Sequence, residues 1–397
     1  MRTAVVGGGA AGFFLAVNLK EMVPQMEVTI LERGQRVLAK VEVSGGGRCN
    51  CTNSFDGVGD LSQVYPRGHR QLKRLFRQFD YHDAYTWFER HGVRLTTQDD
   101  GCVFPASQDS HTIINCFLGE ARRHDIKICT GVKVEVLADL SEYDYVAVCT
   151  GGSPRTEGLR WLADAGHEIV PPVPSLFTLS IADEALTALM GTVVEQAQAM
   201  IPGTKLRADG PLLITHWGVS GPAILRLSSY AARHLAEAGY KVPLSINWTG
   251  LREPEVLSAL QAVMAQNPQK QLQSVRPCRL PSRLWDYLLQ KTLGERATNR
   301  WQNLNQKELN RLSNVLTNDS YLTAGRAAFR DEFVTCGGIA LTSVNLATLE
   351  SRHVPNLYFA GEVLDIDGVT GGFNFQAAWT TAYAVALAIA DKMKNEK

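Results

Sequence analysis

The chain has 397 residues, of which 45% are hydrophobic, so it is long enough for two or three domains with substantial cores. Forty Lys and Arg balance forty Asp and Glu without a basic run, which argues against nucleic acid or a membrane surface as the main partner. No apolar run reaches the roughly 18 residues of a membrane span, and no secretory leader precedes the first apolar segment. We therefore expect a cytoplasmic protein whose eight scattered cysteines are reduced thiols.

The first predicted elements form a βαβ unit. A short apolar strand over residues 4–6 runs into Gly7-x-Gly9-x-x-Gly12, and a helical pattern over 13–22 follows. A second strand over 28–31 ends in Glu32, 20 residues after the last glycine. This arrangement is the dinucleotide-binding fingerprint, in which the helix N-terminus binds the pyrophosphate and the acid binds the ribose hydroxyls. The alternative is a glycine-rich turn in an ordinary βαβ unit.

A second glycine-rich segment is Ser44-Gly-Gly-Gly-Arg-Cys-Asn-Cys-Thr-Asn53. Three consecutive glycines disfavour a helix or strand interior, so we expect a loop. It either wraps around the rest of the dinucleotide, with Arg48 and Asn50 as polar contacts, or serves as a flexible linker. Cys49 and Cys51 suggest a redox disulfide, but two cysteines separated by one residue are more typical of buried packing thiols. No second Cys/His pair is spaced for a metal site.

The rest of the first half alternates helices and strands. We expect a helical region over residues 69–92, a turn at 99–101, a helix capped by Ser110, and strands over 126–129, 133–137 and 145–149. The last of these strands ends in Thr150-Gly151-Gly152.

From Pro171 onward short alternating segments predict a small antiparallel β barrel or sandwich, interrupted by a helix over 219–238. Residues 252–316 are rich in Gln, Leu and Asn and indicate an inserted helical subdomain. Residues 326–335 are expected to return as a barrel strand.

The C-terminal segment has the same order of strand, glycine-rich turn and helix as the N-terminus. A strand over 356–360 ends in Gly361-Glu362, a polar loop with Asp365 and Asp367 follows, and Thr370-Gly-Gly-Phe-Asn374 opens a helix. The N-terminus of this helix either faces an electron-rich ligand or follows a simple turn before a docking helix. The two aspartates either form the turn or lie beside the ligand.

Four glycine-rich turns, at 7–12, 45–47, 151–152 and 371–372, thus lie at or near strand ends. Several loops of one nucleotide-binding fold around one large dinucleotide indicate FAD and not NAD. No second GxGxxG follows a strand, so we expect no dedicated NAD(P)H domain.

These segments resemble the BaiN-like, or aminoacetone-oxidase-like (YhiN-like), bacterial FAD-binding flavoproteins of the glutathione-reductase-type superfamily. The resemblance rests on Val5–Gly12, Lys40–Asn53, Thr215–Pro222 and Leu357–Asn374, and so covers the whole chain. Where many relatives carry a longer Ser-Tyr-Pro-x-Thr-Gly segment, this chain has a shorter one at 153–158. The resemblance implies an α/β fold of three parts: a split Rossmann-type FAD-binding domain (1–172 and 336–397), an inserted β-barrel domain (173–250 and 320–335), and a small helical insert (251–319).

The resemblance also implies which residues contact which part of the cofactor. It assigns the N-terminal glycines and Glu32 to the AMP half, Arg48 to Asn50 and Gly361-Glu362 to the ribityl chain and flavin, and Gly372 to Asn374 to the flavin pyrimidine edge. The full set of expected FAD-binding residues is Gly7, Gly9, Ala10, Ala11, Gly12, Glu32, Arg33, Lys40, Ser44, Gly45, Gly46, Gly47, Arg48, Cys49, Asn50, Val134, Thr150, Gly151, Gly361, Glu362, Gly371, Gly372, Phe373 and Asn374.

The expected function is an FAD-dependent oxidoreductase that transfers a hydride between a small organic substrate and flavin N5. Oxygen, a quinone or a nicotinamide would serve as electron acceptor. The rival interpretations are an NAD(P)H-dependent reductase of an unsaturated substrate and a flavin-binding regulatory or RNA-modification accessory protein. Catalytic candidates are His216, as a general base or a packing histidine, and Tyr65 and Cys49; Tyr65 and Arg67 follow the flavin-wrapping loop and could reach a substrate.

Overall fold

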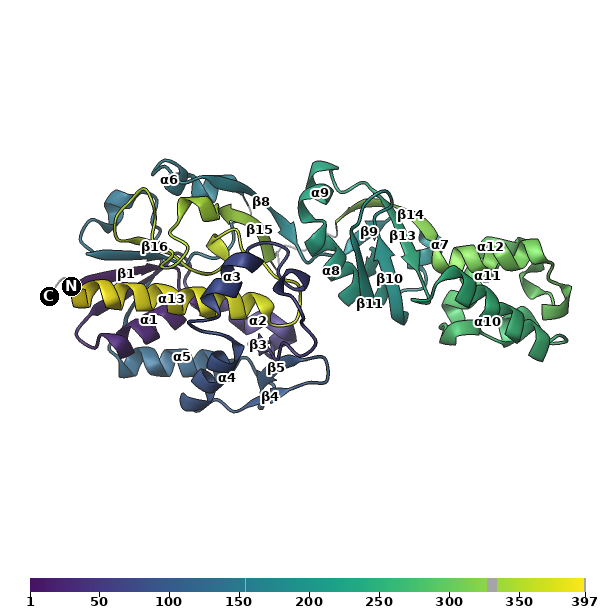
Figure 1. Ribbon diagram of the computed structural model, residues 1–397, viewed down its shortest axis with the longest axis horizontal. Helices are drawn as coiled ribbons and strands as arrows, with labels where there is room; N and C mark the ends of the chain where they lie inside the picture. The colour runs from purple at the N-terminus through teal and green to yellow at the C-terminus, as the bar shows by residue number, and fades with distance from the viewer. Residues whose placement is uncertain (154, 327–333, 396–397) are drawn as a thin grey trace. The chain divides into compact units, whose positions relative to one another are not determined.

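A computed structural model describes residues 1–153, 155–326 and 334–395 (Figure 1). The chain divides into two compact units, residues 1–174 with 334–397 and residues 175–333. The sequence predicts the boundaries between the FAD domain and the barrel at 172/173 and 335/336, where the two units meet at 174/175 and 333/334. Among the described residues, no helix combines the length and apolar character needed to cross a membrane.

The first unit is built on a parallel five-stranded sheet with the strand order β16-β7-β1-β2-β6. Its central strand, β1, is buried from Thr3 to Val6, as expected for a strand covered on both faces. Helices α1, α5 and α13 lie together on one face, where α1 and α13 run side by side (Figure 1). The strands are β1 (Arg2–Val6), β2 (Glu27–Glu32), β6 (Lys127–Thr130), β7 (Tyr145–Val148) and β16 (Leu357–Phe359).

Aromatic rings fill the space between the helices on that face. The Phe14 ring of α1 lies 4.7 Å from the Trp87 ring and 5.1 Å from the Trp379 ring, centroid to centroid. On the opposite face Ala4, Val6 and Leu31 pack against Leu140. The β1-turn-α1 unit is therefore buried on both sides, which holds the glycine turn between them in one place.

Smaller elements complete the first unit. A three-stranded antiparallel sheet has the order β3-β5-β4, and β15 pairs with β8. The bounds are α1 (Ala10–Met22), α2 (Ala39–Gly47), β3 (Thr52–Asn53), α3 (His69–Leu75), α4 (Tyr81–Arg90), β4 (Leu95–Thr97), β5 (Cys102–Pro105), α5 (His111–Arg123), α6 (Arg160–Ala163), β8 (Ile169–Ser175), β15 (Val334–Ile339) and α13 (Phe373–Asn395), with single 3₁₀ turns η1 (Leu61–Gln63), η2 (Leu137–Leu140), η3 (Thr156–Leu159), η8 (Leu341–Ser343) and η9 (Gly361–Val363).

Two local predictions in this unit are wrong, and a third, the helical region, is right in kind but not in continuity. The helical region over 69–92 is two helices, because Asp80 and Asp83 form a capping box that starts α4 anew. Ser110 precedes α5 but its hydroxyl donates to the Glu42 carbonyl oxygen and does not cap the helix. Residues 133–137 form no strand, and the chain there runs into η2.

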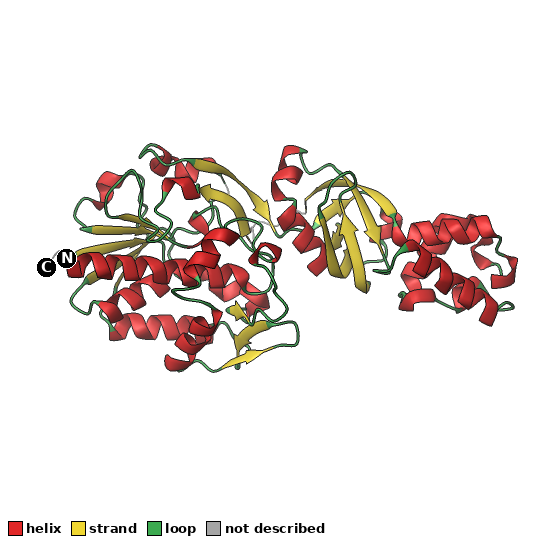
Figure 2. Cartoon of the chain, viewed as in Figure 1, coloured by secondary structure: helices red, strands yellow, loops and turns green. Residues whose placement is uncertain are grey.

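The second unit contains a closed six-stranded antiparallel barrel of order β10-β11-β12-β9-β14-β13, which Figure 2 shows as yellow arrows beside red helices. The predicted fold class, a Rossmann-type domain with a β-barrel domain, is therefore confirmed. The bounds are β9 (Leu179–Ile181), α7 (Glu184–Thr187), β10 (Val193–Met200), β11 (Arg207–Thr215), β12 (Gly218–Ser220), α8 (Pro222–Tyr230), α9 (Ala232–Glu237), β13 (Pro243–Asn247) and β14 (Asp319–Arg326).

Two strand predictions in the barrel are corrected. The sequence predicts two separate short strands over 206–208 and 212–215, but residues 207–215 form one strand, β11, which continues through Gly210 and Pro211. The strand that pairs with both β9 and β13 is β14, which begins at Asp319; most of the predicted strand over 326–335 falls on residues 327–333, outside the described residues.

The helical insert shares one hydrophobic core with the barrel. In the helical insert Trp285 is fully buried in this core. Its indole N–H donates to the Leu272 carbonyl oxygen, and its ring stacks on the Trp301 ring. The elements of the insert are α10 (Glu253–Gln266), α11 (Ser282–Leu293) and α12 (Gln306–Thr317), with 3₁₀ turns η4 (Leu272–Ser274), η5 (Pro277–Arg279), η6 (Gly294–Thr298) and η7 (Trp301–Asn303).

Candidate dinucleotide site

The glycine turns of the first unit gather at one edge of the parallel sheet. They follow β1, β7 and β16, which are neighbours in the sheet, and Glu32 is the last residue of β2, on the other side of β1. The carboxyl ends of parallel strands are where α/β sheets bind ligands. A Cβ atom on Gly7 would lie 2.3 Å from the Cys149 carbonyl oxygen, and one on Gly361 would lie 2.8 Å from the Ala11 Cβ. The three turns therefore touch.

The glycines of the first turn have different roles. Gly7 has φ +115° and packs against Cys149 and Thr150, which follow β7, while a Cβ on Gly12 would lie 2.0 Å from the Gly7 carbonyl oxygen. Both positions exclude a side chain because of the fold. A Cβ on Gly9 would meet no atom within 4 Å, and no side chain caps α1 there. The first N–H groups of α1, at Ala10 and Ala11, thus border open space, as a pyrophosphate site requires.

The Glu32 carboxylate is bound to the backbone of the same turn. Oε2 accepts from the Gly8 N–H at 2.8 Å and Oε1 accepts from the Gly34 N–H at 2.6 Å. Since a carboxylate has about four acceptor positions, each oxygen retains one for a ribose hydroxyl. The segment that carries Val134 runs past this acid, because the Val132 N–H donates to the Glu32 carbonyl oxygen. Val134 itself is half-buried against Leu31, and Arg33 is exposed.

Lys40 and Glu362 connect two segments that the sequence analysis assigned to the same ligand. Lys40 Nζ lies 3.0 Å from Glu362 Oε2, and Glu362 Oε1 accepts from the Thr335 N–H at 2.7 Å. A Cβ on Gly152 would lie 2.7 Å from Glu362 Oε1. The turn after β7 therefore also packs against this ion pair, next to Gly151 and the exposed Thr150.

The triple-glycine segment is a left-handed turn at the end of α2. Gly45, Gly46 and Gly47 have φ of +57°, +69° and +85°, which residues with side chains rarely adopt. Cβ atoms on Gly46 and Gly47 would meet nothing within 4 Å, whereas one on Gly45 would lie 3.0 Å from the Asn50 N atom. The expected loop is therefore present, with an exposed glycine backbone. Ser44 donates to the Val41 carbonyl oxygen.

Arg48 and Asn50 differ in their surroundings. The Arg48 guanidinium lies 4.2 Å from the centre of the Phe104 ring and donates to the Gly45 carbonyl oxygen. Asn50 Oδ1 is buried and accepts no hydrogen bond from the described residues. A buried amide oxygen without a donor costs free energy unless a ligand or water supplies one.

The first turn of α13 closes over this segment. Asn53 Nδ2 donates to the Gly371 carbonyl oxygen at 2.9 Å, and a Cβ on Gly372 would lie 2.7 Å from Asn50 Oδ1. The Tyr65 hydroxyl donates to the Phe373 carbonyl oxygen at 2.8 Å. Asn374 is bound to the backbone of Gly368 through both ends of its amide, at 2.8 and 2.9 Å.

Tyr65 and Cys49, two of the catalytic candidates, are fully buried. Burial raises the pKa of the Tyr65 phenol well above its ordinary value. Burial likewise raises the pKa of the Cys49 thiol to about 12, although a bond with Ser44 opposes the shift. The pKa of Cys51 is also raised by burial. No disulfide joins any of the eight cysteines, all of which lie among the described residues. These side chains support the turn and are poor nucleophiles.

A buried ion pair beside this turn was not expected from the sequence. Arg67 donates from Nε to Asp367 Oδ1 at 2.6 Å and from its terminal nitrogen to Oδ2. Asp367 is fully buried and Arg67 nearly so. The pair fixes the 365–370 loop that leads into α13. The guanidinium of Arg67, which the sequence suggests as a substrate contact, is thus bound to Asp367 in this structure.

The third candidate, His216, lies in the second unit. It is exposed in the turn between β11 and β12, and its ring contacts the Trp217 ring at 4.6 Å between centroids. Residues 156–158 of the shortened segment at 153–158 belong to η3, and Pro154 lies outside the described residues.

Three observations of this structure indicate that the residues at the sheet edge fit FAD. The N-terminus of α1 is open at Gly9, the glycine backbone at 46–47 is open, and the buried Asn50 amide oxygen has no donor. Each lies where the dinucleotide was expected from the sequence.

Comparison with known protein families matches residues 1–388 to the HI0933-like protein Rossmann domain. The chain belongs to the HI0933-like family. The prediction of a BaiN-like flavoprotein, an oxidoreductase with a Rossmann-type nucleotide-binding domain, is thereby confirmed.

Two similar curated proteins extend over nearly the whole HI0933-like chain. One is the 3-dehydro-bile acid delta(4,6)-reductase of Clostridium scindens, which is 26% identical over 98% of this chain and 99% of its own. The other is the ribosomal RNA dihydrouridine synthase of Escherichia coli K12, 27% identical over 96% of both chains. Among solved structures, the 3-ketosteroid delta1-dehydrogenase of Sterolibacterium denitrificans is similar, with 10% identity, 98% and 99% coverage and a TM-score of 0.49.

Proposed function

We propose that this chain is an FAD-dependent reductase of a carbon–carbon double bond conjugated to a carbonyl group, with NAD(P)H as the reductant. One observation supports this choice over an oxidase. The two relatives named above differ in substrate, but each name describes saturation of such a bond: a double bond of the conjugated delta(4,6) pair in a 3-oxo bile acid, or the double bond of a uracil ring. The reaction they have in common is hydride addition to the carbon β to the carbonyl and proton addition to the α carbon.

FAD, when bound, supplies the exchange of a hydride at N5. The chain's own residues would hold it in two halves. The open N-terminus of α1 at Gly9, with Glu32, takes the adenosine and pyrophosphate. Gly46 and Gly47 with Asn50 would take the ribityl and flavin side, and the N-terminus of α13, next to Gly372 and Phe373, would bind the pyrimidine edge. A helix N-terminus there favours negative charge on the reduced ring.

Tyr65 and the Arg67–Asp367 pair position that helix N-terminus, since both fix backbone next to it. Neither Tyr65 nor Cys49 is suited to give a proton to a substrate, because both are buried and their pKa values are raised by burial. His216, in the second unit, is exposed and stays a candidate from the sequence alone. His216→Asn tests it, with His234→Asn on α9 as the control: a lower kcat with unchanged FAD binding would support a role as proton donor, and an unchanged kcat would rule it out.

Anaerobic mixing with NADPH and with NADH tests the reductase directly. One of them should bleach the flavin absorbance near 450 nm, and an α,β-unsaturated ketone added afterwards should restore it. If neither nicotinamide bleaches the flavin while a small amine does, the protein is an amine oxidase and the proposal is wrong.

A second candidate substrate is a uridine within RNA, since two relatives carry the name ribosomal RNA dihydrouridine synthase. The chain as a whole has no net charge, but the helical insert at 251–319 contains ten Lys and Arg against six Asp and Glu. Binding to RNA that weakens steeply between 50 and 200 mM salt would favour this substrate. Equal reduction of a free enone and no RNA binding would favour a small molecule.

A further inference from the structure

Three helices of the first unit bring titratable side chains together at their C-terminal ends. Glu21 lies in the last turn of α1, His91 caps the end of α4, and Glu120 lies in the last turn of α5. Glu21 is about 16 Å along α1 from Ala10, at 1.5 Å per residue, so this cluster is separate from the dinucleotide site. None of its members was singled out as a site by the sequence analysis.

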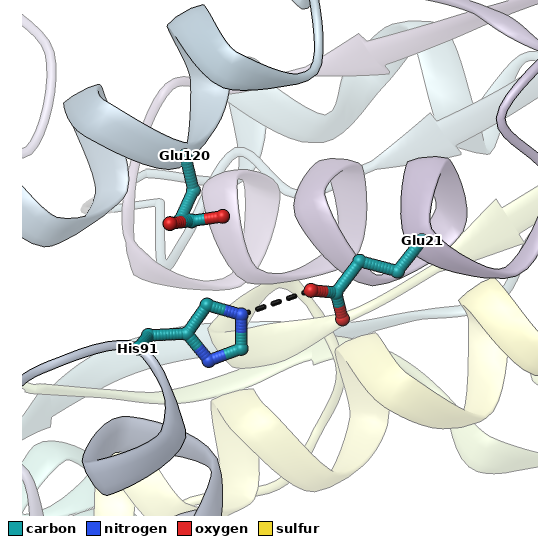
Figure 3. A group of neighbouring side chains, drawn as sticks. All are labelled: Glu21, His91 and Glu120. Carbon is teal, nitrogen blue, oxygen red and sulfur yellow. Dashed lines mark hydrogen bonds and ion pairs between the residues drawn. The ribbon is translucent and has the colours of Figure 1, made fainter.

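The three side chains point toward one another (Figure 3). One ligand-type atom from each, namely a carboxylate oxygen of Glu21, a ring nitrogen of His91 and a carboxylate oxygen of Glu120, lies within 4.8 Å of the other two. A fourth side chain joins them from the next turn of α5. His124 Nε2 lies 3.5 Å from Glu120 Oε2 and 4.0 Å from Glu21 Oε1.

The orientation of the His91 ring is fixed from the opposite side. Its Nδ1 lies 2.7 Å from the Trp87 carbonyl oxygen, which can only accept, so Nδ1 carries a proton. In the neutral ring Nε2 then presents a lone pair, and it lies 2.9 Å from Glu21 Oε1, which is another acceptor. Two acceptors at this distance need a cation between them or a second proton on the ring. Histidine that ligates a metal is usually held in this way, with its other N–H on a carbonyl.

His124 has the complementary property. Its Nε2 is buried and makes no hydrogen bond, although two carboxylate oxygens lie near it. The cluster therefore contains two carboxylates and two imidazole nitrogens that lie close together, and one of these nitrogens, His124 Nε2, makes no hydrogen bond.

We propose that Glu21, His91, Glu120 and His124 bind a divalent transition metal ion, for which Zn²⁺ has suitable ligand preferences. Zinc takes nitrogen and carboxylate ligands at about 2.0–2.2 Å in tetrahedral sites, which places ligand atoms about 3.3 Å apart. The separations of 2.9, 3.5 and 4.0 Å between these ligand atoms lie on both sides of that value, so small side-chain rotations complete the site.

One neighbouring cation competes with the metal. Arg123 donates to the Glu120 carboxylate at 3.2 and 3.4 Å from its exposed side, and it would turn outward or keep one oxygen while the other binds the ion. The ion would join the ends of α1, α4 and α5, so its role is structural and independent of the flavin chemistry.

The test uses the full chain with FAD, treated with a chelator and then titrated with ZnCl₂ in a non-coordinating buffer. Wild type is compared with the double variant Glu21→Gln/His124→Gln, in calorimetry and in thermal unfolding. His111→Gln is the matched control, because His111 lies on α5 outside the cluster and its ring pairs with the exposed Asp109. Circular dichroism verifies that each variant is folded, and Glu120→Gln replaces the double variant if that one is not.

We expect wild type and the His111 variant to bind one Zn²⁺ that raises the melting temperature. In the ligand variant the affinity of this ion should fall more than tenfold, and its thermal shift should disappear. If wild type binds no Zn²⁺, or if the folded ligand variant binds it as tightly as wild type, the assignment is wrong and His91 is only an imidazolium paired with Glu21.

Discussion

A Cβ atom on Gly372 would lie 2.1 Å from the carbonyl oxygen of Thr52. The start of α13 and the short strand β3 are therefore in direct backbone contact, although they are far apart in the chain. The Thr52 hydroxyl strengthens this contact by donating to Gln376 Oε1 at 2.6 Å, and the Trp379 indole N–H donates to the Cys51 carbonyl oxygen. The flavin-side half of the candidate site depends on this junction.

Gly372→Ala should therefore destabilise the protein and weaken FAD binding together. The left-handed φ of +90° costs an Ala about 1–2 kcal/mol, and the collision with Thr52 adds about 1–3 kcal/mol. Urea unfolding measures the loss. Gly203→Ala is the control, since Gly203 has φ +78° with no atom within 4 Å and should show the φ cost alone. Equal losses in the two variants would contradict the contact.

Gly9→Ala should separate binding from folding. Its Cβ would meet no protein atom, and φ at Gly9 is −94°, so the unfolding free energy should change by about 1 kcal/mol or less. The same methyl group would stand where the pyrophosphate approaches, so we expect the Kd for FAD to rise at least tenfold, or about 1.4 kcal/mol. Gly119→Ala, another position with open space, should bind FAD as wild type does. Unchanged FAD affinity in the Gly9 variant would remove the pyrophosphate from this turn.

Asp319→Ala should destabilise the barrel and the helical insert. The buried Asp319 carboxylate accepts from Lys291 Nζ at 2.6 Å and from the Trp248 indole N–H at 3.0 Å, and the Tyr321 hydroxyl donates to it as well. Removing one partner of a buried charged network costs about 3–5 kcal/mol. Urea unfolding should show this loss, while Asp286→Ala on the exposed side of α11 should change stability by about 0.5 kcal/mol or less. A loss below about 1 kcal/mol for Asp319→Ala would show that the network contributes little.

His167 should make stability fall in mild acid. Burial lowers the pKa of His167 below its ordinary 6.5, opposed by a bond to the Leu162 carbonyl oxygen and supported by the nearby His353. Below about pH 6.5 the unfolded chain therefore binds a proton that the folded ring resists, so stability is complete above this pH and is lost as the pH falls toward the lower folded pKa. In His167→Asn the melting temperature should depend less on pH between 5 and 7, whereas His111→Asn should keep the wild-type slope. A wild-type slope in the His167 variant would contradict the shift.

Local patterns predicted the parts of the fold that depend on local chemistry. The strand, the glycines and Glu32 of the first βαβ unit are adjacent in sequence, so their spacing alone predicted the turn that the structure shows. The break before α4 was also encoded locally, in Asp80 and Asp83, but the apolar periodicity on both sides concealed it. The β11 strand continues through Gly210 and Pro211 because neighbouring barrel strands supply the pairing.

Other features arise only from contacts between distant segments. The Arg67–Asp367 pair and the Lys40–Glu362 pair join residues that no spacing rule connects. The cluster of Glu21, His91 and Glu120 likewise needs three helix ends to meet, and each residue alone has the appearance of an ordinary surface group. Tyr65 was a plausible substrate contact by its position after the loop, and only packing shows that its hydroxyl binds the backbone of α13.

The most direct test of the account is the cofactor content of the purified wild-type chain. We predict a yellow protein that releases FAD on denaturation, and an apoprotein whose melting temperature rises with added FAD but less with FMN, which lacks the adenosine half bound at Gly9 and Glu32. A colourless protein that gains no thermal stability from FAD would contradict the central claim.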